Sequence, residues 1–158
     1  MIGATSNVTP MSDTSISTLL EHKGSHVHSV EATLTVAEAV QEMNRHKIGA
    51  VLVTQDGELA GIFTERDVRT RVIAADLDPK TTIVAQVMTH HLITIEPEAT
   101  VGDAMNIFAD KRCRHLPIVD HGRLLGLVSI GDTSRWVANA HRAEAEHLKQ
   151  YIAGGFPV

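Results

Sequence analysis

The chain has 158 residues, of which 43% are hydrophobic, enough to bury the core of one ordinary domain or of two small, closely packed ones. Its 14 Lys and Arg residues against 19 Asp and Glu residues give a formal net charge of -5, the opposite of the basic surface of a nucleic-acid-binding protein. With the single cysteine Cys113, no signal-peptide pattern and no apolar run near the roughly 18 residues of a membrane span, we expect a protein of the reducing cytoplasm that contacts neither nucleic acid nor membrane.

The N-terminal segment divides into a leader and a first helix. Residues 1–14 are rich in Ser, Thr and Asn, which predicts a disordered leader. The next stretch, SISTLLEHKG at residues 15–24, predicts a short helix that Gly24 ends.

The first repeat is predicted at residues 15–75. A short strand is expected at residues 28–30, followed by a helix that starts at the capping pair Thr35 and Glu38 and keeps an apolar period of 3.6. The apolar runs AVLV and LAGIF then flank the turn residues Asp56-Gly57, which predicts a tight hairpin, and a second helix is expected from Glu65.

The second repeat has the same order of elements. Residues 76–82, which contain a proline, predict a linker, and the second repeat is predicted at residues 83–135. It comprises a strand at Leu92–Ile95, a helix capped by Thr100, the strands LPIV and LLGLV around a His121-Gly122 turn, and a helix from Ile130. Residues 136–158 are expected to form a C-terminal helix and tail.

An internal duplication links the two repeats. Residues 35–67 match residues 100–132 without a gap at an offset of 65, and the stretch GIFTERD at residue 61 returns as GLVSIGD at residue 126. The predicted fold is therefore α+β, a mixed arrangement of two β-α-β-β-α units.

These motifs carry a family resemblance over residues 15–135. The paired G-h-h-[TS]-x-x-D motifs (h apolar), HLPIVD at residues 115–120 and the stretch VAQVMTHHLITIEPEATVGDAM resemble tandem CBS domains, the cystathionine-β-synthase-type repeats that pair into a Bateman module. The resemblance implies two repeats packed with pseudo-twofold symmetry and a pocket built across them at each motif.

The two motif aspartates, Asp67 and Asp132, have two readings that are compatible with each other. Thr64 or Ser129, three residues earlier, forms with each a capping-box pattern, in which hydroxyl and carboxylate satisfy the first backbone N–H groups of a helix. The same helix start also favours an anion, and a carboxylate there can accept both hydroxyls of a ribose. The resemblance implies that this Asp holds the ribose of an adenine nucleotide.

The resemblance also implies which residues complete each pocket. The Asp132 pocket would comprise Lys23, His28, Ile48, Arg114, His115, Ser129 and Asp132. The Asp67 pocket would comprise Thr64, Arg66, Asp67, Met88, Ile93 and Cys113. For the apolar members, ordinary core packing is the alternative role. Arg114 or His115 is the expected phosphate partner, and because the first repeat has Gly49-Ala50 there, the Asp132 pocket is favoured for phosphate.

Other chemistries find little support in the sequence. The ten histidines lack the spacing of known zinc motifs, so no metal site is expected. Nothing places a general base beside Cys113, and neither a Walker motif nor G-x-G-x-x-G is present, so we expect no enzyme activity and no catalytic cofactor.

The leading hypothesis is a stand-alone regulatory module that binds an adenine nucleotide in the clefts between its repeats. AMP is the first choice, with NAD(H), ATP, ADP and S-adenosylmethionine open. The resemblance also implies a homodimer, with the C-terminal tail or the leading helix at or beside the interface. An apolar stripe on the C-terminal helix should pack on its own domain or on a second copy. Its members are Trp136, Val137, Ala140, Leu148, Tyr151 and Ile152. The alternative is a ligand-free dimerisation module that docks a client protein through vestigial pockets; a fragment of a larger enzyme or channel is disfavoured, because both termini end close to the repeats.

Overall fold

The computed structural model describes residues 13–153, which form two compact units. The first-repeat unit comprises residues 26–94, and the second-repeat unit comprises residues 13–25 together with residues 95–153. Most of the predicted leader lies outside the described residues, as do residues 154–158 of the tail.

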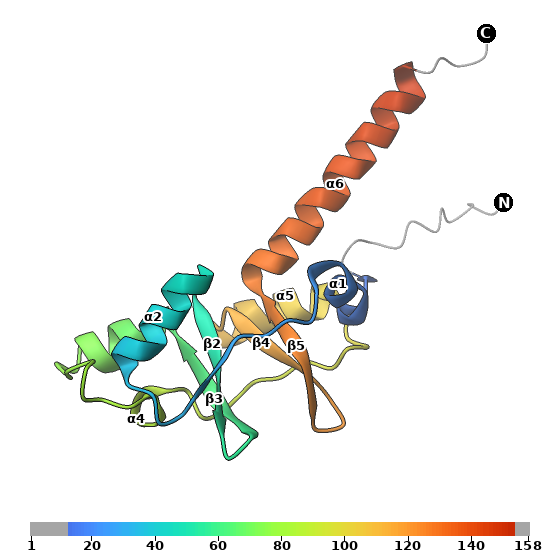
Figure 1. Ribbon diagram of the computed structural model, residues 1–158. Helices are drawn as coiled ribbons and strands as arrows, with labels where there is room; N and C mark the ends of the chain where they lie inside the picture. The colour runs from blue at the N-terminus through green and yellow to red at the C-terminus, as the bar shows by residue number, and fades with distance from the viewer. Residues whose placement is uncertain (1–12, 154–158) are drawn as a thin grey trace, which may run out of the picture. The chain divides into compact units, whose positions relative to one another are not determined.

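The first-repeat unit is built around a three-stranded sheet in the order β1-β2-β3. Figure 1 labels its hairpin strands β2 and β3. β1 is parallel to β2, and β2 pairs with β3 in an antiparallel hairpin. In chain order its elements are β1 (Ser29–Glu31), α2 (Val36–His46), β2 (Ala50–Gln55), β3 (Glu58–Thr64), the single turn α3 (Glu65–Asp67), the π-helix η2 (Val68–Ile73) and α4 (Val84–Val87).

The second-repeat unit is built around the antiparallel hairpin β4-β5. In chain order its elements are α1 (Ile16–Lys23), α5 (Val101–Lys111), β4 (His115–Asp120), β5 (Arg123–Ser129) and the long helix α6 (Ile130–Ala153). The predicted helix before Gly24, both hairpins and the helix starts at Glu65 and Ile130 are confirmed.

The duplication extends to the backbone of the hairpins. Each hairpin carries the same register shift, after Val53 in one and after Ile118 in the other. Each turn has two consecutive residues with positive φ, 53° and 80° at Asp56-Gly57 and 48° and 78° at His121-Gly122. This is the pattern of a type I′ turn, which suits the right-handed twist of a two-stranded ribbon.

The central helices begin at complete capping boxes. The Glu38 backbone N–H donates to the Thr35 hydroxyl, and the Thr35 N–H donates to the Glu38 carboxylate at 2.8 Å. Thr100 and Asp103 repeat the arrangement at α5. Both helices then bury their apolar face against their own sheet, as the period of 3.6 residues predicts.

Each unit takes its closing segment from the first residues of the other predicted repeat. The apolar side of α1 belongs to the core of the second-repeat unit, where the Ile16 N–H donates to the Ala99 carbonyl at 2.7 Å. α4 belongs to the core of the first-repeat unit, where the Val84 N–H donates to the Leu34 carbonyl at 2.8 Å. The compact units therefore differ at their ends from the repeats read along the sequence.

The predicted strand at Leu92–Ile95 is wrong, because only a single parallel bridge forms there, between Ile95 and Ile118. In the first-repeat unit, the Leu52 N–H donates to the His28 carbonyl and extends the pairing of β1 with β2. The position 65 residues later is Pro117, which has no N–H to donate. Loss of that donor removes the bond that would lengthen the second-repeat strand.

The predicted stripe on α6 divides at about its middle. Trp136 and Val137 pack against the core of their unit, as expected for the part of the stripe near the hairpin. Leu148, Tyr151 and Ile152 are exposed by 59%, 63% and 63%. Every residue from 141 to 153 is exposed, so this part of α6 packs on no core within the described chain.

Candidate functional site

Asp132 sits in the first turn of α6, directly after β5, and caps that helix. Its Oδ2 accepts the Ser129 N–H at 2.8 Å, and its own N–H donates to the Ser129 hydroxyl at 3.1 Å. Strand β5 therefore delivers the hydroxyl and helix α6 delivers the carboxylate to the same point. This capping arrangement is the one predicted from the sequence.

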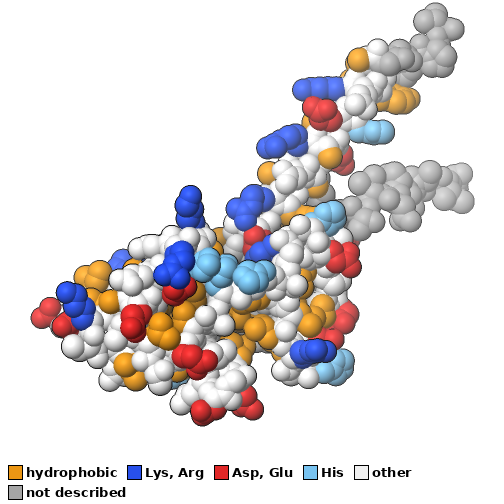
Figure 2. All heavy atoms as spheres, viewed as in Figure 1, with side chains coloured by type: hydrophobic (Ala, Val, Ile, Leu, Met, Phe, Trp, Pro, Cys, Tyr) orange, Lys and Arg blue, Asp and Glu red, His pale blue; other side chains and the backbone are white. Residues whose placement is uncertain are grey.

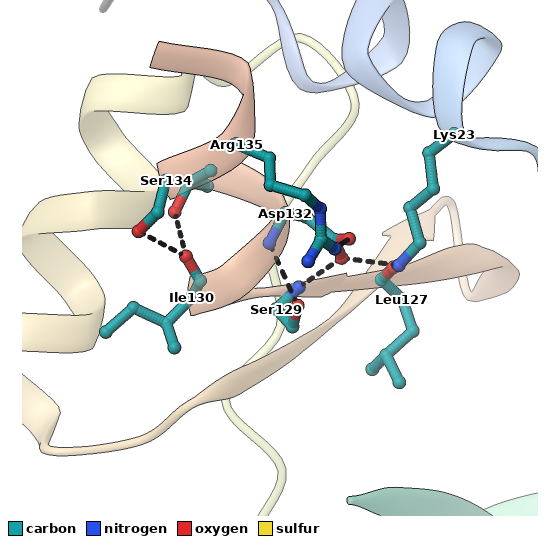
Figure 3. Close-up of polar contacts among 8 residues, drawn as sticks. Lys23, Leu127, Ser129, Ile130, Asp132, Ser134 and Arg135 are labelled. Carbon is teal, nitrogen blue, oxygen red and sulfur yellow. Dashed lines mark hydrogen bonds and ion pairs between the residues drawn. The ribbon is translucent and has the colours of Figure 1, made fainter. Parts of the chain in front are cut away.

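Two cationic side chains cover the Asp132 carboxylate (Figure 3). The Lys23 Nζ, from the last residue of α1, lies 2.5 Å from Oδ2 and also donates to the Leu127 carbonyl. The Arg135 Nη2 lies 2.8 Å from Oδ1. Both carboxylate oxygens are thus engaged, and the Asp132 side chain is only 9% exposed.

The electrostatic balance at Asp132 favours the ionised form. Burial opposes ionisation and alone would raise the pKa of the carboxyl, but the hydrogen bond from Lys23, the Ser129 N–H and the charge of Lys23 outweigh it, so the pKa is lowered from its usual value. Asp132 is therefore a carboxylate at neutral pH, and it can accept hydroxyl donors such as those of a ribose.

Asp67 forms the same capping box with Thr64 but is covered differently. Its Oδ2 accepts the Thr64 N–H at 3.0 Å, and its Oδ1 accepts the Thr89 hydroxyl at 3.1 Å. The Arg71 Nε lies 3.5 Å from Oδ1. Asp67 is 3% exposed, which makes it a buried charged residue of the first-repeat unit.

The predicted phosphate partners Arg114 and His115 lie next to the Asp132 motif along the hairpin. His115 pairs in register with Ser129 across β4 and β5. The Arg114 carbonyl accepts the Ile130 N–H at 2.9 Å. His115 is the half-buried first residue of β4, and Arg114 is exposed and directly precedes that strand, so both residues lie at the start of the strand that pairs with the one carrying the motif hydroxyl.

The remaining predicted site residues are distributed over both units. Of the Asp132 set, His28 and Ile48 belong to the first-repeat unit; of the Asp67 set, Cys113 belongs to the second-repeat unit. These assignments stay predictions. Ile48 and Cys113 pack beside the cores of their own units, which is the ordinary role considered for them.

Within the first-repeat unit, Met88 lies close to the Asp67 motif. It is 2% exposed, its Sδ lies 2.9 Å from the Cβ position of Gly61, and its carbonyl accepts the Arg71 Nη1 at 2.9 Å. Arg66 is exposed within α3, and Ile93 is 38% exposed in the segment after Met88.

Three residues of these clusters were absent from the predicted sets: Arg135, Arg71 and Thr89. The two arginines lie three and four residues after the motif aspartates, a spacing that places opposite charges side by side on a helix and that sequence reasoning could have used. Thr89 has no such local signal, because its position depends on how the chain returns to β3 after α4.

Comparison with known proteins identifies the family. The family model described as CBS domain matches residues 24–74 and again residues 84–139. The chain belongs to the CBS domain family.

One relative of this CBS protein is the CBS domain-containing protein CBSX3 of Arabidopsis thaliana, whose name describes it as mitochondrial. It is 42% identical to this chain over 127 residues. The match covers 77% of this chain and 62% of the relative, so the chain spans less than two thirds of that protein.

Two solved CBS structures extend the comparison. A protein of Burkholderia ambifaria, described as a candidate signal-transduction protein with CBS domains, is 34% identical with a TM-score of 0.76, over 78% of this chain and 93% of that one. A hexameric CBS-CP12 protein from bloom-forming cyanobacteria is 30% identical with a TM-score of 0.66, over 75% of this chain and 68% of that one. The family thus includes regulatory and oligomeric proteins.

Two further properties concern residues 13–153. No helix in this range is both long and apolar enough to cross a membrane. No group of three or more His, Cys, Asp and Glu side chains in the same range is arranged to hold a metal ion.

Proposed function

We propose that this CBS protein is a regulatory module, without catalytic activity, that binds an adenine nucleotide at Asp132, with AMP as the first ligand to test. The other candidate ligands all contain the same adenosine group: NAD(H), ATP, ADP and S-adenosylmethionine. Binding would change the affinity for a partner, because a ligand shifts an equilibrium through its different affinities for two states.

The observation that carries this proposal is the set of donors and acceptors at the start of α6. The ionised Asp132 carboxylate is an acceptor for the two adjacent hydroxyls of a ribose. Lys23 and Arg135 are held beside it, His115 begins the adjacent strand β4, and Arg114 directly precedes that strand. Such cations bind phosphate oxygens through charge-assisted hydrogen bonds, so one residue cluster offers partners for both parts of a nucleotide.

A thermal-shift screen tests the proposal. Purified protein would be heated with AMP, ADP, ATP, NAD, NADH or S-adenosylmethionine, and the Tm recorded against ligand concentration. A ligand at about 100 times its Kd stabilises by about 2.7 kcal/mol, which for a chain of this size raises the Tm by roughly 5 °C or more. The shift should vanish in Asp132→Ala. A Tm unchanged by every compound would refute the proposal.

A ligand-free interaction module is the second candidate function. It is favoured by the engagement of both motif carboxylates by groups of their own units, which is what helix caps alone require. Asp132→Asn separates the two candidates, since an amide oxygen still accepts the Ser129 N–H while the charge that attracts ribose hydroxyls is lost. Equal nucleotide affinity in the wild type and this variant would favour the interaction module.

A homodimer is also part of the proposal, with α6 beside the interface. Figure 2 shows basic, acidic and hydrophobic side chains mixed along the exposed part of this helix. Leu148 and Ile152, four residues apart, expose apolar surface there, and the relatives include an oligomeric protein. Sedimentation velocity tests the assembly: a dimer has twice the chain mass of 17.1 kDa.

The compartment proposed is the cytoplasm, because the only cysteine of the chain, Cys113, cannot form an internal disulfide. The name of the Arabidopsis relative places that protein in mitochondria. Fractionation of the source cells, with the protein detected in the cytosolic or organellar fraction, distinguishes the two.

A further inference from the structure

The two motif aspartates are accompanied by the same backbone acceptor. In the first-repeat unit the carbonyl of Ile62 lies five residues before Asp67, and in the second-repeat unit the carbonyl of Leu127 lies five residues before Asp132. Each carbonyl and carboxylate together bind one neighbouring residue. The identity of that residue differs between the units.

In the first-repeat unit the neighbour is Thr89, and it is part of the backbone fold. Its N–H donates to the Ile62 carbonyl at 2.8 Å, its carbonyl accepts the Ile62 N–H at 3.0 Å, and its hydroxyl donates to Asp67. The preceding Met88 is buried, and Arg71 binds its carbonyl. Moving Thr89 away from Asp67 would break this backbone bridge on β3.

In the second-repeat unit the neighbour is Lys23, and only the end of its side chain takes part. The ammonium group donates to the Leu127 carbonyl and to Asp132, replacing both the N–H and the hydroxyl of Thr89 (Figure 3). The Lys23 side chain is 31% exposed, and that of Arg135 is 71% exposed. Rotation about side-chain bonds is enough to uncover Asp132, so no backbone bond has to break.

The difference originates in the length of the preceding helix. Leu20 on α1 and Met88 after α4 occupy corresponding places, because each meets the Cβ position of the motif glycine, Gly126 or Gly61. After Met88 the chain becomes extended, with ψ of 161°, and runs onto β3. After Leu20 the helix continues to Lys23, so a side chain reaches the acceptors there.

From this difference we infer that the two motifs have separate roles: Asp67 is a structural cap, and Asp132 alone accepts ligand while Lys23 moves from the carboxylate to the ligand phosphate. The inference rests on the proposed function and states its stoichiometry, one nucleotide per chain. Ligand binding would also loosen the end of α1 from β5 and α6, because the hydrogen bonds that hold the Lys23 side chain there are exchanged for bonds to the ligand.

Calorimetric titration with two probes tests the inference: AMP, which carries a phosphate, and adenosine, which does not. Wild-type protein should bind one AMP per chain. Asp132→Asn should lower the affinity for both probes by about tenfold or more, which is the scale of one hydrogen bond to a charged group. Asp67→Asn, the matched substitution in the other unit, should leave both affinities within about threefold, a change well below that scale.

The Lys23→Met variant isolates the exchange, because methionine keeps an apolar stem and loses the ammonium. AMP should bind about tenfold more weakly than to the wild type, whereas adenosine should bind equally well or better, since no cation competes for Asp132. A purely structural lysine would change both affinities alike, and that result would refute the exchange.

The remaining outcomes separate the inference from the proposed function. Two AMP molecules per chain, or equal losses in Asp67→Asn and Asp132→Asn, would overturn the inference and leave the proposed function standing. If no adenosine compound of the thermal-shift panel binds, both fail. Should Asp67→Asn not fold, Thr89→Val replaces it: this variant removes the hydroxyl that covers Asp67 and is expected to keep one AMP per chain at unchanged affinity.

Discussion

The two motif glycines allow a matched test of how rigidly each motif is covered. A Cβ added at Gly61 would lie 2.6 Å from the backbone oxygen of Thr89 and 2.9 Å from the Sδ of Met88. A Cβ added at Gly126 would lie 2.6 Å from one methyl group of Leu20, and its next neighbour, the other methyl group, is at 3.4 Å. The same methyl therefore meets backbone in one unit and the end of a flexible side chain in the other.

The expected loss of stability in each variant depends on whether backbone or a side chain has to move. In Gly61→Ala the Thr89 carbonyl must retreat from its hydrogen bond with Ile62, and overpacking of this kind costs about 1–3 kcal/mol. Alanine recovers about 0.4–1 kcal/mol by restricting the unfolded chain, so a net loss of about 1–2 kcal/mol is expected. In Gly126→Ala a rotamer change of Leu20 costs about 0.5–1.5 kcal/mol, which the same gain largely offsets.

Urea unfolding followed by far-UV circular dichroism measures both losses, and hydrogen exchange of the Ile62 and Thr89 amides locates the first one. Gly61→Ala should lower the unfolding midpoint and accelerate exchange at these two amides, while Gly126→Ala should leave both close to wild type. Equal midpoint losses in the two variants, or a larger loss in Gly126→Ala, would show that the backbone bridge is no stiffer than the Leu20 side chain and would refute the reasoning.

Three further predictions concern other parts of the chain. Thr100→Ala removes the α5 cap and should lower the free energy of unfolding by about 1 kcal/mol in urea titrations, while Thr100→Ser retains it. Burial, followed by the charge of His46, lowers the pKa of His28, so the stability contributed by the neutral imidazole is complete above the usual pKa of 6.5 and is lost as the pH falls below it. The urea midpoint should therefore fall between about pH 7.5 and 5.5 in the wild type and fall less in His28→Gln; an equal fall in both contradicts the assignment. Leu148→Glu together with Ile152→Glu should shift the sedimentation coefficient toward that of a monomer without lowering the Tm of the monomer, and an unchanged dimer would remove α6 from the interface.

The parts of the fold that could be predicted from sequence depend on local chemistry repeated at a fixed offset. The Asp56-Gly57 and His121-Gly122 turns, and the helix caps at Thr35 and Thr100, are each determined by residues within a few positions of one another. Duplication doubled the evidence for each of them, because the same pattern occurs twice.

The features that could not be predicted from the sequence depend on residues that are far apart in the chain and close only in space. The strand predicted at Leu92–Ile95 completes a second β-α-β-β-α unit, but its length is decided by a missing N–H at Pro117 on another strand. In the same way, the capping role of Asp132 could be read from Ser129, three residues earlier, whereas its contact with Lys23 comes from a helix more than a hundred positions away. The family resemblance supplied Lys23, and periodicity alone would have left it as a solvated helix end.

The contrast between Lys23 and Thr89 also explains how a duplicated motif can diverge without a change in the motif itself. Both aspartates, both hydroxyls and both glycines are retained, so each hairpin still folds and each following helix is still capped. What changed is the segment in front: four residues of α4 against eight residues of α1. After the shorter helix, Thr89 is fixed by its backbone bridge to Ile62 and covers the carboxylate with its hydroxyl. After the longer helix, a long cationic side chain satisfies the corresponding acceptors and can leave them. A difference of one helical turn outside the repeated sequence is thus sufficient to make one copy structural and the other responsive.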